Sequence, residues 1–314
     1  MRASSVARAL ILVLCIYTLV ACGRSSDTRP RASLLGINPH LTSGSLKVRG
    51  TMPRFSADNK LVIFGGSGKA NIYAFDLSEQ KQTKLSSNVW DQEPCWIPGT
   101  DDFVFASCGT ETEGQEFQIW RFSGKTTTLR RLLNFKSKQT EQYPLVSPSG
   151  DFLVFSDTYL ELTSPNGEVP IQLTNGKSAF DVGCDWSRDS KRVLFLRTPE
   201  YSPEGRIQIC EIHSDGSNMK ILLERTLTGA SQVSAIAWAR YTPDGNGIYY
   251  SDFNRLYYLP EGACRPRQIF EDAACEQIGE FDLSTDGKYF VYQRGHERSI
   301  GEIVVELIAE RASS

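Results

Sequence analysis

The sequence predicts an all-β fold, a six-bladed β-propeller in which each blade is a four-stranded antiparallel sheet. Three observations predict it: a short apolar strand core returns six times, an aromatic residue follows each core at a constant distance, and turn residues separate the two. Repeats of about 40 to 55 residues indicate a stacked or radial array, because one repeat alone cannot bury its apolar face. Four short strands in each repeat favour a propeller.

Each repeat starts at an aromatic or apolar residue in the core of a short strand, here called the starting residue. The spacings are 41, 50, 40, 55 and 42 residues, and the starting residues are Phe55, Trp96, Val146, Trp186, Tyr241 and Leu283. Small polar residues follow one and three positions later, as in Ser56 and Asp58. Such side chains bond to nearby backbone amides, so each repeat is predicted to begin with a tight hairpin.

The second strand of each repeat carries an aromatic residue nine positions after the starting residue. These six residues are Phe64, Phe105, Phe155, Phe195, Tyr250 and Tyr292. The residue seven positions after each starting residue is apolar as well. Because alternate residues of a strand point to opposite faces, these columns are expected to pack neighbouring sheets together.

Third strands are predicted in all six repeats and fourth strands in five. The predicted third strands are residues 71–77, 117–122, 159–162, 207–213, 256–259 and 302–307, and the fourth strands are 82–85, 129–135, 171–174, 219–223 and 268–270. Residues 43–48 lie before the first hairpin at the offset of a fourth strand. This N-terminal strand is expected to complete the last blade and close the ring, which removes the free sheet edges.

Residues 1–21 have the composition of an export signal, with Arg2 and Arg8 before an apolar run that is too short to span a bilayer. Residues 19–22 read Leu, Val, Ala, Cys and resemble the lipobox of bacterial lipoproteins. That resemblance implies a lipidated Cys22, carrying acyl chains such as palmitate, and Gly23 in place of an Asp implies the outer membrane. The alternative is an ordinary secretory signal cut after Ala21.

The predicted domain plan is a signal peptide over 1–21, a lipidated tether over 22–33 and one propeller over 34–314. The blades are expected at about 50–88, 89–136, 137–180, 181–230, 231–276 and 277–314 plus 43–48. Without the two signal arginines, 32 basic residues face 37 acidic ones, a net charge of −5. Nucleic acid and anionic lipid surfaces are therefore not expected as partners, since both are bound through basic patches. Membrane attachment is expected through the lipid alone.

Residues 53–59 resemble the Pro, x, aromatic, Ser, x, Asp, Gly signature of TolB-type propeller repeats, and residues 241–245 repeat it. Residues 214–218 resemble that family's turn between third and fourth strands, and the likeness covers residues 46–307. It implies a periplasmic scaffold that receives a protein partner at one mouth of a central channel. TolB proteins carry an α/β domain before the propeller, whereas 32 residues separate Cys22 from Phe55, so the Tol-system role is not carried over.

Polar, mostly acidic residues stand just before the innermost strand of several repeats, where the loops of a propeller converge on one channel mouth. The side chains of this predicted rim are expected on the surface. They are Asp91, Gln92, Glu93, Glu141, Gln142, Asp181, Glu276 and Gln277, with Gln232 and Glu280 in matching segments. As a functional site it would dock a basic or polar group, with or without a cation. The alternative is ordinary polar loop surface.

Six cysteines follow Cys22, and an oxidising compartment would permit disulfides between them. Cys95 and Cys108 are expected at the same end of one hairpin and are the favoured pair. The other four are expected as thiols. No spacing fits a zinc site, the three histidines are scattered, and neither a GxSxG nor an HExxH run occurs. Neither a cofactor, a metal nor a catalytic set is predicted.

The favoured function is a membrane-anchored envelope lipoprotein that binds a protein partner at the channel mouth and is not an enzyme. A propeller enzyme, such as a polysaccharide lyase or hydrolase, is the alternative, because such families can resemble these repeats. Their channels usually gather His, Gln and Arg or Lys, whereas the predicted rim is acidic. A surface adhesin is a third hypothesis.

Overall fold

The computed structural model describes residues 43–66, 71–88, 90–109, 116–133, 140–156, 158–175, 179–199, 206–226, 236–296 and 299–308. Strands and turns make up this part of the chain, and no helix in it could cross a membrane. The predicted signal peptide, the tether and Cys22 lie outside the described residues.

Four of the sheets each have four antiparallel strands in sequence order. The first of these sheets consists of β5 (Gln92–Trp96), β6 (Phe103–Ser107), β7 (Gln118–Ser123) and β8 (Thr128–Arg131), and the second of β9 (Gln142–Val146), β10 (Leu153–Ser156), β11 (Leu160–Thr163) and β12 (Ile171–Gln172). The third consists of β13 (Ala179–Trp186), β14 (Arg192–Pro199), β15 (Arg206–His213) and β16 (Lys220–Thr226). The fourth consists of β17 (Ile236–Tyr241), β18 (Gly247–Asp252), β19 (Arg255–Pro260) and β20 (Arg267–Glu271). The predicted second, third and fourth strands of these repeats are present, with small differences at their ends. Residues 134–135 of one predicted fourth strand lie outside the described residues.

The fifth sheet has seven strands in the order β21-β22-β23-β1-β2-β3-β4. They are β21 (Gln277–Leu283), β22 (Tyr289–His296), β23 (Ser299–Leu307), β1 (Gly44–Phe55), β2 (Leu61–Gly66), β3 (Ile72–Asp76) and β4 (Lys81–Lys84). The long strand β1 lies between β23, the last strand of the chain, and β2. Its first half pairs with β23 through Gly44, Ser45 and Arg49, and its second half pairs with β2 from Gly50 onward.

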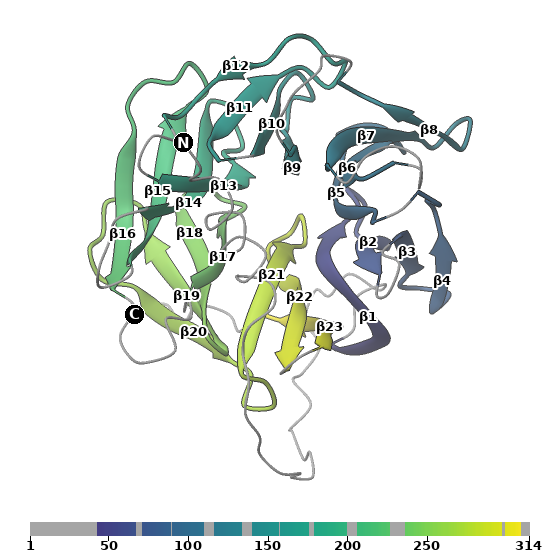
Figure 1. The fold of residues 1–314 in the computed structure, drawn as a ribbon. Coiled ribbons are helices and arrows are strands. Elements are labelled where there is room, and N and C mark those ends of the chain that lie inside the picture. Colours follow the sequence, from purple (N-terminus) through teal and green to yellow (C-terminus); the bar gives the residue numbers. More distant parts are fainter. Residues whose placement is uncertain are drawn as a thin grey trace.

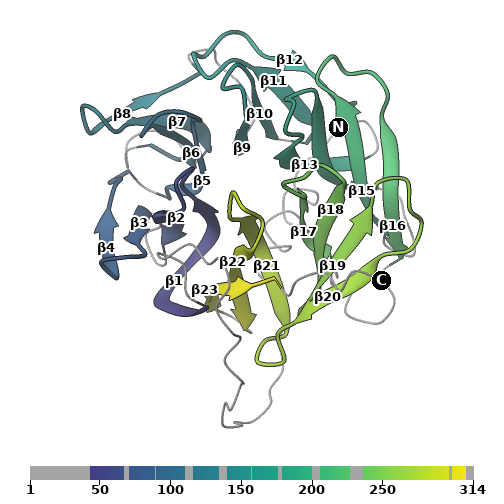
Figure 2. The same cartoon turned by 180° about the vertical axis from the view of Figure 1, so that it is seen from behind.

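The sheets are arranged around one axis, with β1, β5, β9, β13, β17 and β21 innermost (Figure 1). Each of these strands contacts the next, and β21 contacts β1. Figure 2 shows the same arrangement from the opposite face. Side chains that leave the innermost strands therefore meet near this axis.

The hairpin that opens each repeat forms as the turn residues predict. In the first repeat, the Ser56 hydroxyl donates to Asp58 Oδ1 at 2.7 Å, and the same oxygen accepts the Lys60 amide at 3.1 Å. Asn59 takes a φ of 56°, a left-handed backbone that Asn tolerates. The Ser56 hydroxyl lowers the pKa of Asp58, so this turn holds its carboxylate in the charged form.

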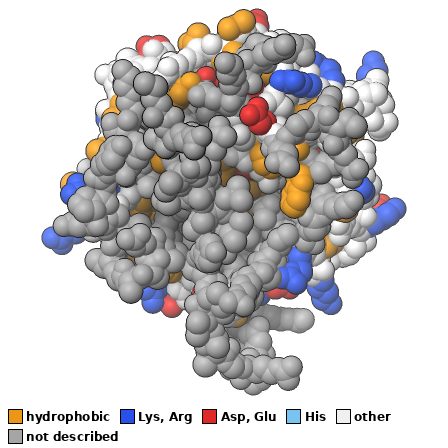
Figure 3. All heavy atoms as spheres, viewed as in Figure 1, with side chains coloured by type: hydrophobic (Ala, Val, Ile, Leu, Met, Phe, Trp, Pro, Cys, Tyr) orange, Lys and Arg blue, Asp and Glu red, His pale blue; other side chains and the backbone are white. Residues whose placement is uncertain are grey.

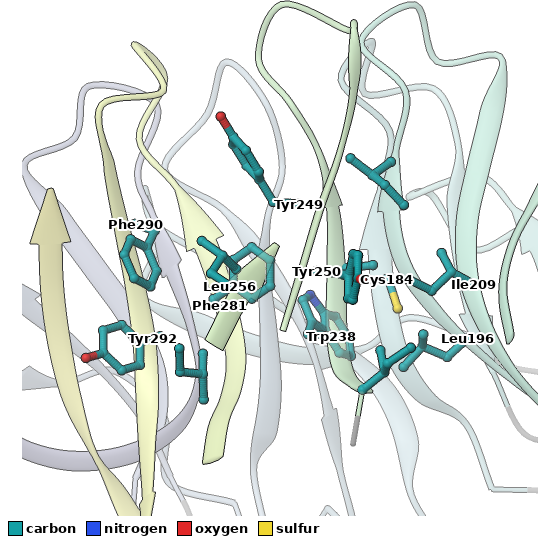
Figure 4. Close-up of a cluster of buried hydrophobic side chains, with 14 of the residues drawn as sticks. Cys184, Leu196, Ile209, Trp238, Tyr249, Tyr250, Leu256, Phe281, Phe290 and Tyr292 are labelled. Carbon is teal, nitrogen blue, oxygen red and sulfur yellow. The ribbon is translucent and has the colours of Figure 1, made fainter. Parts of the chain in front are cut away.

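The aromatic column of the second strands is fully buried, as predicted. Every one of its members has an exposed fraction of zero: Phe64, Phe105, Phe155, Phe195, Tyr250 and Tyr292. They pack in clusters that join neighbouring sheets, and the largest of these clusters combines residues of β13–β15, β17–β19 and β21–β22. Figure 4 shows part of it, with Trp238, Tyr250 and Cys184 side by side.

Candidate functional site

Every innermost strand is interrupted by a register shift near its middle, a β-bulge in which the pairing with the second strand slips. Bulges turn a side chain out of its regular direction and are common beside functional sites. The residues three positions before the starting residues lie at these bulges and are called the bulge residues: Met52, Glu93, Tyr143, Gly183, Trp238 and Glu280.

Three bulge residues have a strained backbone. Met52, Glu93 and Tyr143 have φ angles of 52°, 59° and 54°, and each is followed by a proline. A left-handed backbone is costly for residues with these side chains, and a following proline restricts them further. Strain of this kind persists only where the surrounding fold imposes it, and it is concentrated at functional sites.

Side chains from non-neighbouring strands meet near the axis. The Arg54 guanidinium lies 5.2 Å from the centre of the Trp238 ring, although β21 separates β1 from β17 around the ring. The Tyr143 and Trp238 ring centres are 6.4 Å apart, although β13 separates β9 from β17. Arg54 and Trp238 are 5% and 2% exposed. These contacts bring together side chains of the three innermost strands β1, β9 and β17 at the level of the bulges.

An ion cluster lies near Arg54 and Trp238. Its residues each stand one position before a starting residue. Arg240 Nη1 is 2.7 Å from Asp185 Oδ1, and Arg240 Nη2 is 2.9 Å from Asp282 Oδ1. The second oxygen of each aspartate accepts a backbone amide of another innermost strand: Asp185 from Tyr241 at 2.9 Å and Asp282 from Phe55 at 2.8 Å. The cluster therefore ties β13 to β17 and β21 to β1.

In this cluster, each charged group favours the charged form of its partner. Burial raises the pKa of Asp185, and Arg240 opposes that rise. Burial alone would lower the pKa of Arg240, but Asp282 and Asp185 raise it above the usual value. Paired charges of this kind are stable only while all partners are present, since a single buried charge is costly.

Arg54 has different surroundings. Its Nη1 donates to the carbonyl oxygens of Pro53 at 3.3 Å and Phe281 at 3.4 Å, and its buried Nε has no hydrogen-bond partner. No carboxylate of a described residue pairs with it, in contrast to Arg240. Burial and the charge of Arg240 lower the pKa of Arg54 to about 10. The guanidinium is therefore still charged at neutral pH.

Two acidic bulge residues lie near Arg54. Glu93 is 6% exposed, and its Oε2 accepts the Tyr143 amide at 2.6 Å. Burial raises its pKa to about 8, and the charge of Glu280 adds to the rise. Burial also raises the pKa of Glu280. The structure thus places Glu93 of the predicted rim on the innermost strand β5, as a buried group rather than a surface group.

Three other rim carboxylates are buried and bonded within the fold, so their expected place on the surface is wrong. Asp91 Oδ2 accepts the Ser86 hydroxyl at 2.5 Å, and Glu141 Oε2 accepts the Ile119 amide at 3.0 Å. Asp181 forms two bonds of 2.7 Å with the Arg197 guanidinium. These three residues, Asp91, Glu141 and Asp181, are at most 1% exposed. Their carboxyl groups bond to other parts of the fold instead of facing the solvent.

The remaining rim residues are accessible. Gln92, Gln142 and Gln277 are half-buried at the starts of β5, β9 and β21, and Glu276 is exposed just before β21. Gln232 lies outside the described residues. The accessible part of the predicted rim is therefore more amide than acid.

The predicted disulfide between Cys95 and Cys108 is not present. Cys95 lies opposite Val104 in the β5–β6 pairing, four residues before Cys108. At 3.3 Å per residue this offset is about 13 Å, too far for a disulfide. Cys95 Sγ instead accepts the Val146 amide at 3.4 Å and thereby links β5 to β9.

Metal and pocket features are sparse in the described part of the chain. It contains no group of three His, Cys, Asp or Glu side chains that could hold a metal ion. An open pocket of about 320 Å³ lies on β7 and β8, beside the Arg121–Asp102 ion pair of 2.6 Å and the exposed Arg130. In this sheet, strand β6 separates β7 and β8 from the innermost strand β5.

A separate apolar surface lies at the outer edge. Val169 and Ile171, beside and on β12, are 80% and 58% exposed, and Ile221 on β16 is 51% exposed. The turn before β16 lies against the end of β12, since a Cβ on Gly216 would be 3.7 Å from the Leu173 oxygen. Figure 3 shows hydrophobic side chains gathered along the top edge, over β12.

Sequence reasoning missed most of the axial residues, although the repeat carried a signal for them. Arg54, Asp185, Arg240 and Asp282 all stand one position before a starting residue. A charged residue is unexpected between the apolar residues of an innermost strand. That column, read across the repeats, would have pointed to the cluster.

No protein family and no curated protein sequence matches this chain. Solved structures do resemble it. TolB from Acinetobacter baumannii has a TM-score of 0.54 at 17% identity, over 82% of this chain and 56% of that one. A nidogen/laminin complex has a TM-score of 0.60 at 12% identity, over 79% and 89%. An oligogalacturonate lyase in complex with manganese has a TM-score of 0.58 at 12% identity, over 82% and 77%.

The antiparallel sheets around one axis and these likenesses define the chain as a β-propeller. Within that class its fold is TolB-like, as residues 53–59 and 241–245 predicted.

Proposed function

We propose that this protein is a non-catalytic scaffold of the cell envelope that binds a protein partner at the axis of its propeller. The strained bulge residues carry this proposal. Met52, Glu93 and Tyr143 hold a left-handed backbone before proline in three successive innermost strands, and a ring built for packing alone has no need of that strain. The TolB-like fold and the likeness to a chain of a nidogen/laminin complex support a protein as the partner.

The proposed propeller has six blades and is closed by its N-terminal strand. In this arrangement the first half of β1 is the outer strand of the last blade, and the second half is the inner strand of the first blade. The pairing of β1 with both β23 and β2 supports it. Deleting residues 43–48 would then remove the closing strand and destabilise the whole domain, which thermal unfolding would detect as a clear fall in Tm.

The proposed location is the outer membrane, facing the periplasm, with the lipid on Cys22 as the only anchor. The lipobox-like residues 19–22 and the TolB-like fold support it. Cys22→Ala should move the protein from the membrane fraction to the soluble periplasmic fraction with an unchanged Tm. Continued membrane association of a folded Cys22→Ala protein would contradict the lipid anchor.

The partner site can be tested by site-specific photo-crosslinking in intact cells. A photoreactive residue at Gln142 or Gln277, at the starts of β9 and β21, should capture one envelope protein. The same residue at Thr83, exposed on the outer strand β4, is the control and should not capture it. Capture from Thr83 alone would place the contact on the outer edge, and no capture from either inner position would contradict axial docking.

An enzyme remains the second candidate, because a manganese-bound oligogalacturonate lyase shares the fold. Lyase activity would create a carbon–carbon double bond in a uronic acid chain. Incubation of the purified protein with oligogalacturonate and Mn²⁺, followed by ultraviolet absorbance, tests this directly. A rise in absorbance that Arg54→Gln abolishes would replace the scaffold proposal with a catalytic one.

A further inference from the structure

Arg54 is a buried charge with unused hydrogen-bonding capacity. Arginine is rarely buried without a carboxylate partner, because the guanidinium loses its hydration. Of its five N–H groups, two lie on Nη1, and that nitrogen donates to the carbonyl oxygens of Pro53 and Phe281. The Nε–Nη2 edge therefore has no acceptor among the described residues.

The free edge has the geometry for one chemical group. A carboxylate accepts two parallel hydrogen bonds from one edge of a guanidinium, which is the strongest and most specific form of this contact. The Trp238 ring lies against the guanidinium, with 5.2 Å between the guanidinium carbon and the ring centre. Arg240, at the same repeat position, already binds two carboxylates from its own chain.

We propose that Arg54 binds one carboxylate of a ligand that reaches the axis of the propeller. The inference rests on the proposed function only for the source of this group, a side chain or the C-terminus of the protein partner.

Sodium acetate is a probe for this site that needs no partner protein. The full chain is unfolded thermally in increasing acetate, with chloride replacing it at constant ionic strength and pH. Wild-type protein should show a saturable rise in Tm, since a ligand that binds only the folded state stabilises it. Arg54→Gln should lose this rise. Arg54→Lys should need at least about tenfold more acetate, because lysine cannot form the paired bonds.

The matched control is Arg130→Gln, which removes an exposed arginine beside the pocket on β7 and β8. It should keep the wild-type acetate response. A response lost in Arg130→Gln but kept in Arg54→Gln would move the anion site to that pocket and overturn the proposal. The absence of any saturable response in the folded wild-type protein would overturn it as well.

Two blocked peptides distinguish the sources of the carboxylate. Acetyl-Gly-Gly-Asp-Gly-Gly-amide carries only a side-chain carboxylate, and acetyl-Gly-Gly-Gly carries only a C-terminal one. The peptide that raises Tm at the lower concentration identifies the source, and the Asn analogue of the first peptide should have no effect. If acetate and peptides act through Arg54 but photo-crosslinking captures no protein, the anion site stands and the proposed scaffold function fails.

Discussion

Arg240 and Arg54 occupy the same position of two repeats, one residue before Tyr241 and Phe55, yet their roles differ. Arg240 is held by two carboxylates within 2.9 Å, whereas Arg54 has two long bonds to carbonyl oxygens and the face of an indole ring. The two arginines have the same backbone position in their repeats, but the neighbouring innermost strands carry different side chains around each of them. One arginine is therefore a structural clamp, and the other keeps capacity for a ligand.

The largest effect is expected from Arg240→Leu. Removing this guanidinium leaves Asp185 and Asp282 without their partner, and breaking a buried ion pair in this way costs about 3 kcal/mol or more. Urea denaturation should show that loss in the free energy of unfolding. A loss below about 1 kcal/mol would mean that the cluster is not a clamp, and the comparison with Arg54 would fail.

A smaller loss is expected when a buried carboxylate of the predicted rim is reversed. Glu141→Lys removes the acceptor of the Ile119 amide and buries a cation in its place, which should cost about 2 to 3 kcal/mol. Glu276→Lys makes the same change at an exposed position and should stay within about 0.5 kcal/mol. Equal denaturation curves for the two variants would show that both carboxylates behave as surface groups.

The pH dependence of stability should reveal the raised pKa of Glu93. Its pKa is about 8 in the folded protein and 4.5 in the unfolded chain, so the folded state holds this proton to higher pH. Its contribution is complete below about pH 4.5 and is lost as the pH rises toward 8. Between pH 5 and 8 the wild type should lose at least about 1 kcal/mol relative to Glu93→Gln. Parallel pH profiles for the two proteins would contradict the raised pKa.

The smallest effect is expected from Arg54→Leu without ligand. Replacing a buried group that lacks a carboxylate by an apolar one is about neutral or stabilising, so the free energy of unfolding should change by less than about 1 kcal/mol. Chemical denaturation beside Arg240→Leu measures the difference directly. A loss as large as that of Arg240→Leu would identify Arg54 as a second structural clamp.

The sequence predicted the repeat and its packing well because those depend on local rules. Ser56 and Asp58 form their turn from hydrogen bonds within a few residues. Phe64 and Phe105 are buried because alternation along a strand places them on the packed face. Neither result requires knowledge of a distant partner.

The candidate site was predicted only in part, because it depends on distances between repeats. Asp91 and Glu141 were found by their place before the innermost strands, but their burial depends on the Ser86 hydroxyl and the Ile119 amide. Cys95 was paired with Cys108 by counting strand ends, whereas β5 begins at Gln92 and the hairpin sets Cys95 opposite Val104, next to the Trp96–Phe103 pair. The bulge residues are a further case, because a bulge changes register by one residue and leaves little trace in hydrophobic periodicity.

The sequence by itself determined the all-β repeat, the hairpin turns and the aromatic column, since backbone preferences and strand alternation act over fewer than about ten residues. Only the tertiary structure decided which arginine is paired. Asp185, Arg240 and Asp282 come from three different sheets, and their distances depend on how the innermost strands are arranged around one axis. Electrostatic energy depends on such through-space distances and on burial, neither of which is a property of position along the chain.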